Sequence, residues 1–253
     1  MTKNYPQHPK FPHDCYMINI RVEEQSVLKK RDIFYKYFPY KEKIQKNPHI
    51  TLFQCINLNR GYKEDQFFKI FEECAKNFNY LPYQIDGFFG LKWWSKTQRV
   101  IAHKIHSSPE LDNFTDCMVR ELFSGKGNQK SIANGTWTDE HPEDKELHAT
   151  IVWKLSIREA EMVWGWLDQD PGFFYKFLSL FKLKNWNPPG RKIGPINAEY
   201  DALRLTIFKN NRIIAEYDLP RKIWIMGNDL WDGKQWFQTV AEYKKLVGNR
   251  THP

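Results

Sequence analysis

Two short apolar runs in this chain each hold a histidine and a threonine two residues apart. His49-Ile-Thr51 lies in the first run, and His148-Ala-Thr150 lies in the second. Alternate residues of a β-strand point to the same face, so each histidine would share a face with its threonine. We therefore predict two β-strands that present two imidazoles and two hydroxyls to a common site.

The segments around the two motifs repeat one order of predicted elements. Alternating apolar residues predict strands, and apolar residues at helical spacing, such as those over 63–78, predict helices. The predicted order is strand 15–22, helix 24–37, strand 49–56, helix 63–78, strand 83–91, strand 99–105, helix 108–124 and strand 147–155. Strands are also predicted over 193–200, 202–208 and 213–217, and a helix over 234–247. Hairpins in this order favour antiparallel pairing and an α+β fold.

The chain is predicted to form one domain with a short leading arm. Residues 1–14 are polar and Pro-rich, which is typical of an extended arm. Residues 15–253 contain no linker-like stretch, so they are assigned to a single domain. Within it, 157–190 is rich in aromatic residues and is predicted to form helical segments inserted against the core.

The basic charge favours an anionic partner. The chain has a formal charge of +8 and an aromatic content of 16% over 253 residues. A basic excess suits RNA, an oligonucleotide or a nucleotide, although a solvated basic surface explains the same charge equally well. No stretch is long and apolar enough to span a membrane, so no membrane partner is expected. The chain is expected to be a monomer.

The cysteines and the N-terminus bear on location. The four cysteines have no metal-binding spacing and lie beside apolar residues, which predicts buried, reduced thiols and an intracellular protein. The N-terminus lacks the apolar core of a signal peptide. A cytoplasmic location is expected, or a nuclear one if the source is eukaryotic.

Two histidines and two threonines match what cleavage of a phosphodiester needs. Imidazole titrates near neutral pH, so one histidine can remove a proton from the attacking oxygen while the other protonates the leaving oxygen. The threonine hydroxyls are short, stiff donors for the non-bridging oxygens. We therefore predict His49, Thr51, His148 and Thr150 as the catalytic residues. The scheme needs no metal and no cofactor, and none is predicted.

The two motifs carry a family resemblance. HITL at 49–52 and HATI at 148–151 resemble the paired H-x-[ST]-x motifs of the 2H phosphoesterase superfamily, which includes RNA 2′,3′-cyclic phosphodiesterases and proteins called 2′-5′ RNA ligases. The resemblance covers about residues 15–155 and the closing strands near 193–217. It implies two pseudo-symmetric α+β lobes, a pseudo-two-fold pair of antiparallel sheets with outer helices and a central cleft that has one motif on each wall.

The resemblance favours hydrolysis of a 2′,3′-cyclic phosphate, or of a 2′-5′ linkage, in an RNA end or oligonucleotide. Two alternatives stay open: a non-catalytic RNA- or nucleotide-binding module, and a phosphodiesterase that degrades 2′-5′ or cyclic oligonucleotide signals. Trp93 and Trp94 are candidates for base stacking, and Arg191 and Lys192 for phosphate contacts. Further tryptophans with the same possible use are Trp164, Trp166 and Trp186. The motifs do not identify the natural substrate or tell which histidine is the base.

Overall fold

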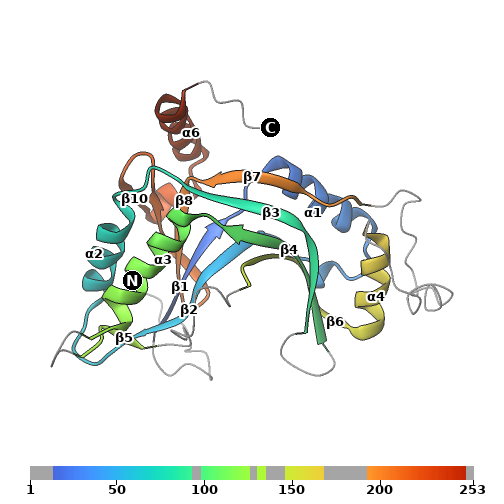
Figure 1. Ribbon diagram of the computed structural model, residues 1–253, viewed down its shortest axis with the longest axis horizontal. Coiled ribbons are helices and arrows are strands. Elements are labelled where there is room, and N and C mark those ends of the chain that lie inside the picture. The colour runs from blue at the N-terminus through green and yellow to red at the C-terminus, as the bar shows by residue number, and fades with distance from the viewer. Residues whose placement is uncertain (1–13, 93–97, 126–129, 135–145, 168–192, 249–253) are drawn as a thin grey trace.

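A strongly curled antiparallel sheet organises the computed structural model of the chain (Figure 1). The structure describes residues 14–92, 98–125, 130–134, 146–167 and 193–248. Four predicted substrate-binding residues, Trp93, Trp94, Arg191 and Lys192, lie outside the described residues. The predicted arm, apart from Asp14, lies outside them too.

The strands and helices follow the predicted order closely. The strands are β1 (Cys15–Arg21), β2 (His49–Leu58), β3 (Leu81–Lys92), β4 (Gln98–Ser107), β5 (Ala133–Asn134), β6 (His148–Ser156), β7 (Asn197–Ala202), β8 (Arg204–Lys209), β9 (Arg212–Asp218) and β10 (Ile223–Met226). The helices are α1 (Gln25–Tyr37), α2 (Glu64–Ala75), α3 (Pro109–Phe123), α4 (Ile157–Trp166) and α6 (Gly233–Val247), with short 3₁₀ turns at η1 (Lys41–Lys43) and η3 (Gly227–Trp231). These elements confirm an α+β fold.

Local sequence explains where several elements begin. The hydroxyl of Ser108 accepts a hydrogen bond from the backbone N–H of Leu111, and Pro109 is the first residue of α3. Ser156 and Glu159 form a reciprocal capping box at the start of α4. Asn210 and Asn211 both have positive φ in the turn between β8 and β9. Asparagine tolerates this conformation, so the turn favours the hairpin.

The two motif strands lie side by side in the middle of the sheet. The strand order is β10-β9-β8-β1-β2-β6-β4-β3-β7, with β5 beside β2. The two halves meet where β2 pairs with β6, at Ile50 and Ala149. Two separate sheets were expected, and the structure instead joins them into one. The pairing of the halves through the motif strands themselves is the reason for this difference.

Two apolar cores pack against the sheet. The first spans both halves, and in it the buried rings of Phe67 and Phe71 on α2 and of Phe114 on α3 join core residues of β1, β2, β3 and β4. In the second, α1 and α4 pack on β4 and β6. Trp166 belongs to this second core, only 5% exposed and edge-on to Phe34 at 5.0 Å. Its predicted use for base stacking is therefore wrong.

The cysteines differ from the prediction. Cys74 on α2 and Cys117 on α3 form a disulfide, whereas Cys15 and Cys55 are free thiols. Both bonded residues face the space between two helices that pack together, which the sequence spacing of 43 residues does not reveal. The prediction of four reduced thiols is wrong for this pair, and the thiol argument for an intracellular location no longer holds.

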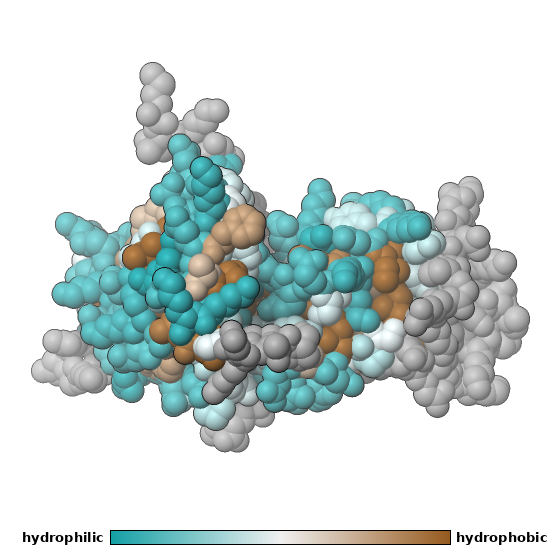
Figure 2. Space-filling model, turned by 90° about the horizontal axis from the view of Figure 1, so that it is seen from above, coloured by the Kyte–Doolittle hydropathy of each residue, from teal (hydrophilic) through white to brown (hydrophobic). Residues whose placement is uncertain are grey.

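The face of the molecule seen in Figure 2 is predominantly hydrophilic. None of the described helices is both long and apolar enough to cross a membrane. In the view of Figure 2, hydrophobic residues form separate patches within a mostly hydrophilic surface. This surface fits the low mean hydropathy of −0.68.

The disulfide should stabilise the first core. Reduction should lower the free energy of unfolding by about 2–4 kcal/mol, because the bond closes a long loop in the unfolded chain. Guanidinium unfolding with and without dithiothreitol measures this difference. The double variant Cys74→Ala/Cys117→Ala is the control, since its stability should not respond to the reductant. Thiol titration of the unreduced, unfolded chain should find two of the four cysteines reactive, and a count of four would contradict the bond.

Candidate functional site

The four motif side chains line a single cavity. His49 and Thr51 reach it from β2, and His148 and Thr150 reach it from β6. The cavity has a volume of about 360 Å³. The residues between them, Ile50 and Ala149, are fully buried on the other face of the sheet. The predicted sharing of one face by each histidine and its threonine is thus observed on both strands.

The pairing of the two strands sets how the four side chains meet. Ile50 and Ala149 are the middle residues of the two motifs, and they are each other's partner in the antiparallel pair. Continuing this register places His49 opposite Thr150 and Thr51 opposite His148, on the cavity face. The two imidazoles therefore lie on one diagonal of a four-residue square and the two hydroxyls on the other.

Both histidines are held by the same backbone contact. Nδ1 of His49 lies 3.0 Å from the carbonyl oxygen of Asn47, and Nδ1 of His148 lies 3.0 Å from that of Glu146. A carbonyl oxygen only accepts hydrogen bonds, so Nδ1 must carry the hydrogen and donate it. The lone pair of each neutral ring is then on Nε2. The repeated contact fixes ring orientation and tautomer together.

Burial sets the proton affinity of His49. Loss of hydration lowers the pKa of its imidazole below 6.5, and the contact with the Asn47 carbonyl opposes only part of that effect. His49 is therefore a neutral imidazole at pH 7. Its ring centroid lies 6.4 Å from that of Phe208, which contributes to its apolar surroundings.

Gln45 is a further neighbour of His49. Its amide nitrogen lies 3.3 Å from Nδ1 of His49 and donates to the Asn47 carbonyl at 3.1 Å. The backbone N–H of Gln45 donates to the carbonyl of Ile151 on β6. The segment before β2 is thereby tied to the other motif strand, and Gln45 lines the cavity.

Each motif strand bulges at the same distance beyond its histidine. Cys55 and Lys154 both lie six residues after a motif histidine, and they have φ of 51° and 52°. In both cases the pairing register with the outer strand shifts at that point. A bulge redirects the side chains beside it. Gln54 at the first bulge, and Trp153 and Lys154 at the second, all line the cavity.

Several cavity residues are not among the predicted site residues. They are Met17, Asn19, Gln45, Gln54, Gln98, Arg99, Val100, Trp153, Lys154, Phe208 and Asn211. One signal for Met17 and Asn19 was present in the sequence, because they share the face of β1 opposite the core residues Ile18 and Ile20. No comparable signal marks Arg99 or Phe208, whose places depend on strand pairing far along the chain.

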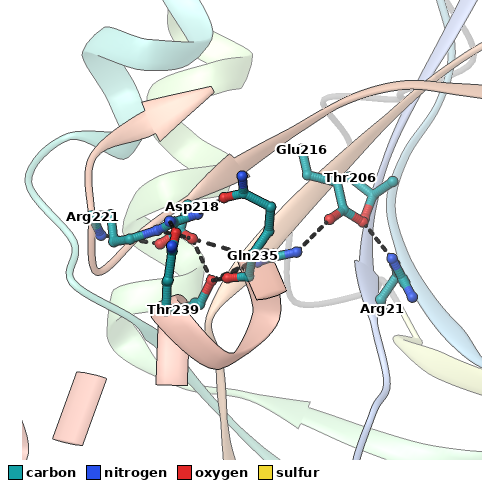
Figure 3. A network of polar contacts seen from close by, with 9 residues as sticks. Arg21, Thr206, Glu216, Asp218, Arg221, Gln235 and Thr239 are labelled. Carbon is teal, nitrogen blue, oxygen red and sulfur yellow. Dashed lines mark hydrogen bonds and ion pairs between the residues drawn. The ribbon is translucent and has the colours of Figure 1, made fainter. Parts of the chain in front are cut away.

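A polar row connects the cavity to a buried ionic network. Strand pairing places Thr51, Asn19, Thr206 and Glu216 next to one another across β2, β1, β8 and β9. The carboxylate of Glu216 is fully buried and accepts hydrogen bonds from Arg21, at 2.8 Å, and from Thr206, at 3.2 Å. Figure 3 shows this end of the network.

The same network holds α6 against the sheet. Arg204 bridges Glu216 and Thr239. Arg221 binds Asp218 and Gln235, as Figure 3 shows. Both carboxylates are fully buried, and buried charges need such complete pairing. The strands on one side of the cavity are therefore fixed by ionic contacts as well as by backbone pairing.

Among the described residues, no cluster of metal ligands and no further histidine adds to this site. Within the part of the chain that the structure describes, no three His, Cys, Asp or Glu side chains cluster as metal ligands would. His103 pairs with Ala149 and is buried, and its burial lowers its pKa to about 4. It does not line the cavity.

Comparisons with known proteins include a distant likeness to a solved structure. No protein-family model and no curated protein matches the chain. A solved structure described as "Crystal structure of phosphoesterase" is similar over 81% of this chain and 98% of its own, with 11% identity and a TM-score of 0.39. This likeness is too distant to assign a family or an activity.

The pKa of His49 can be measured directly. Its titration midpoint should fall below 6.5, because burial disfavours the imidazolium. The unfolded chain then binds a proton that the folded chain does not, so stability should fall as pH drops from about 6.5 toward the folded pKa. Two-dimensional NMR of the imidazole C–H groups gives the midpoint, with His49→Gln to assign the signal. A midpoint above 6.5 would contradict the burial argument.

Proposed function

We propose that the chain is a metal-independent phosphodiesterase that opens a 2′,3′-cyclic phosphate on an RNA end or oligonucleotide. The observation that carries the proposal is the meeting of two imidazoles and two threonine hydroxyls in one cavity. Both imidazoles have Nδ1 bound to a carbonyl, so both Nε2 atoms are set for proton transfer. The net charge of +8 would favour a polyanionic substrate.

The reaction needs one proton taken and one proton given. A water attacks the phosphorus while one histidine accepts its proton, and the bond from phosphorus to one ribose oxygen breaks as the other histidine protonates that oxygen. The product is a phosphomonoester with a free ribose hydroxyl. The hydroxyls of Thr51 and Thr150 donate to the non-bridging oxygens, where negative charge grows in the transition state.

We assign the base role to His49. A general base must be neutral before the reaction, and the lowered pKa of His49 keeps it neutral at pH 7. His148 is then the acid. Each turnover exchanges their protonation states, and solvent restores them. The activity should follow a bell-shaped pH profile, as expected for two coupled histidines.

We also propose that the two halves are a pseudo-two-fold repeat of the 2H phosphoesterase type. The antiparallel pair at Ile50 and Ala149 has a local two-fold axis, which exchanges the two motifs. The matching bulges at Cys55 and Lys154 support an axis that extends beyond the motifs. The outer neighbour of each histidine is also a cation, Arg21 beside His49 and Lys104 beside His148.

Removing either imidazole tests the proposal. His49→Ala and His148→Ala should each lower kcat/KM on nucleoside 2′,3′-cyclic phosphates by about 10²–10⁴-fold, because each removes a proton-transfer group. Activity of the wild type should persist in EDTA. His106→Ala is a matched control, since His106 is exposed, pairs with Asp86 and lies away from the cavity. Full turnover in either motif variant would contradict the proposal.

Each threonine hydroxyl should contribute less to the rate than either imidazole does. Thr51→Val and Thr150→Val keep the side-chain shape and remove one hydroxyl each, so kcat should fall about 10–100-fold, the worth of a hydrogen bond to a charged group. Steady-state kinetics separate this from a change in KM alone. Unaltered kcat in both variants would remove the hydroxyls from the mechanism.

Two other functions give different results in the same experiments. A binding module without catalysis would bind RNA with a steep salt dependence and turn over none of these substrates. An enzyme that degrades signalling oligonucleotides would prefer 2′-5′ oligoadenylates or cyclic oligonucleotides over 2′,3′-cyclic ends. Including all three substrate types in one assay distinguishes the alternatives.

A further inference from the structure

Asn19 is a buried cavity residue with an unsatisfied amide. Its side chain is 2% exposed and lines the cavity, and its Oδ1 has no hydrogen-bond partner among the described residues. Leaving a buried amide oxygen without a donor costs about 1–3 kcal/mol. An ordered water or a bound molecule would remove that cost by supplying the donor.

The protein groups beside Asn19 are already committed. Thr206, its neighbour on β8, donates its hydroxyl to Glu216. The guanidinium groups of Arg21 and Arg204 also bind Glu216. On the other side stands Thr51, which the proposed mechanism directs at the phosphate. Among the described residues beside Asn19 no donor is left for its Oδ1, and a molecule bound in the cavity can supply one.

The surroundings of Asn19 fit a flat ring with a polar edge. Met17 and Phe208 are cross-strand partners on β1 and β8, and both line the cavity beside Asn19. They give an apolar surface, while the amide gives one donor and one acceptor. Nucleobases are bound by this combination of stacking on an aromatic side chain and hydrogen bonding at an edge.

The other half of the cavity differs at the corresponding place. Asn19 is the outer neighbour of Thr51, and Ala102 on β4 is the outer neighbour of Thr150. Ala102 has no polar side chain and is fully buried. The second half instead presents Arg99 and Lys154 to the cavity. The two ends of the cavity thus have different chemistry, neutral and amide-bearing on one side and cationic on the other.

We propose that Asn19 reads the base of the nucleotide whose phosphate lies between the two motifs. This inference rests on the proposed function. The base stacks beside Met17 and Phe208, and the Asn19 amide bonds to its donor and acceptor edge, the pattern by which asparagine pairs with bases. Arg99 and Lys154 then face the opposite side of the phosphate, where an oligonucleotide continues.

The test compares bases within each variant. The kcat/KM values are measured for the four nucleoside 2′,3′-cyclic phosphates and for abasic ribose 2′,3′-cyclic phosphate. The wild type should prefer one base by about tenfold or more, the discrimination of one good amide–base pair. Asn19→Leu, similar in size but apolar, should lower kcat/KM for the preferred base to the level of the other three, and should lower kcat/KM for the abasic substrate by a smaller factor.

Asn19→Asp gives a second, directional result. A carboxylate only accepts hydrogen bonds. Guanine has two adjacent N–H donors on its Watson–Crick edge, so the preference among bases should shift toward guanosine. Ratios within one variant are compared, because the added charge will also weaken all phosphate substrates. An unchanged order of bases in both variants would overturn the proposal.

A structural role for Asn19 predicts other outcomes. If Asn19 reads the base and has no structural role, Asn19→Leu should leave Tm unchanged or raise it, because the substitution removes no hydrogen bond within the protein. A uniform loss of kcat/KM on all substrates, abasic included, would instead show that Asn19 positions Thr51 and would overturn base reading.

If the wild type turns over none of these substrates, the proposed function fails. Calorimetric binding of the four nucleoside 3′-monophosphates to wild type and Asn19→Leu then tests base reading independently, and equal base preferences would overturn it.

Discussion

The contact between β2 and β6 at Ile50 and Ala149 is the constraint on which the site depends. Because side chains alternate across a sheet, a one-residue slip of this pairing would turn one motif away from the cavity. The apolar middle residues resist such a slip, since both are fully buried in the cores behind the sheet. The same residues that separate histidine from threonine in sequence therefore fix where all four polar side chains meet.

The outer strands keep this contact in register. On one side, β1 pairs with β2 and is followed by β8 and β9, where the Glu216 and Asp218 network fastens α6. On the other side, β4 pairs with β6 and continues into β3. Replacing one charged partner in the network would leave a buried carboxylate uncompensated, at a cost of several kcal/mol. The network thus holds β8 and β9 in place beside β1, the strand that carries Asn19.

The spacing of apolar residues predicted most helices and strands, because it repeats with the period at which side chains face the core. It located both motif strands, and Ser108 with Pro109 marked the start of α3. It did not predict β10, a strand of four residues, nor the disulfide between Cys74 and Cys117, which depends on how two helices pack. The motif residues were identifiable because their polarity breaks an apolar pattern. Arg99 and Phe208 were not, because only the strand order brings them to the cavity.

Two motifs with matching contacts cannot by themselves give the proposed reaction a direction. His49 and His148 lie on paired strands, and each has Nδ1 against a backbone carbonyl oxygen. Only their surroundings can assign one as base and the other as acid. On the side of His49, burial lowers the pKa of the imidazole, and Met17 and Phe208 line the cavity there. The half that carries His148 adds Arg99 and Lys154, whose charge favours phosphate. In the proposed mechanism, substrate orientation and the direction of proton transfer would both follow from this asymmetry. A substitution that alters base preference at Asn19 should consequently leave the roles of the two histidines unchanged.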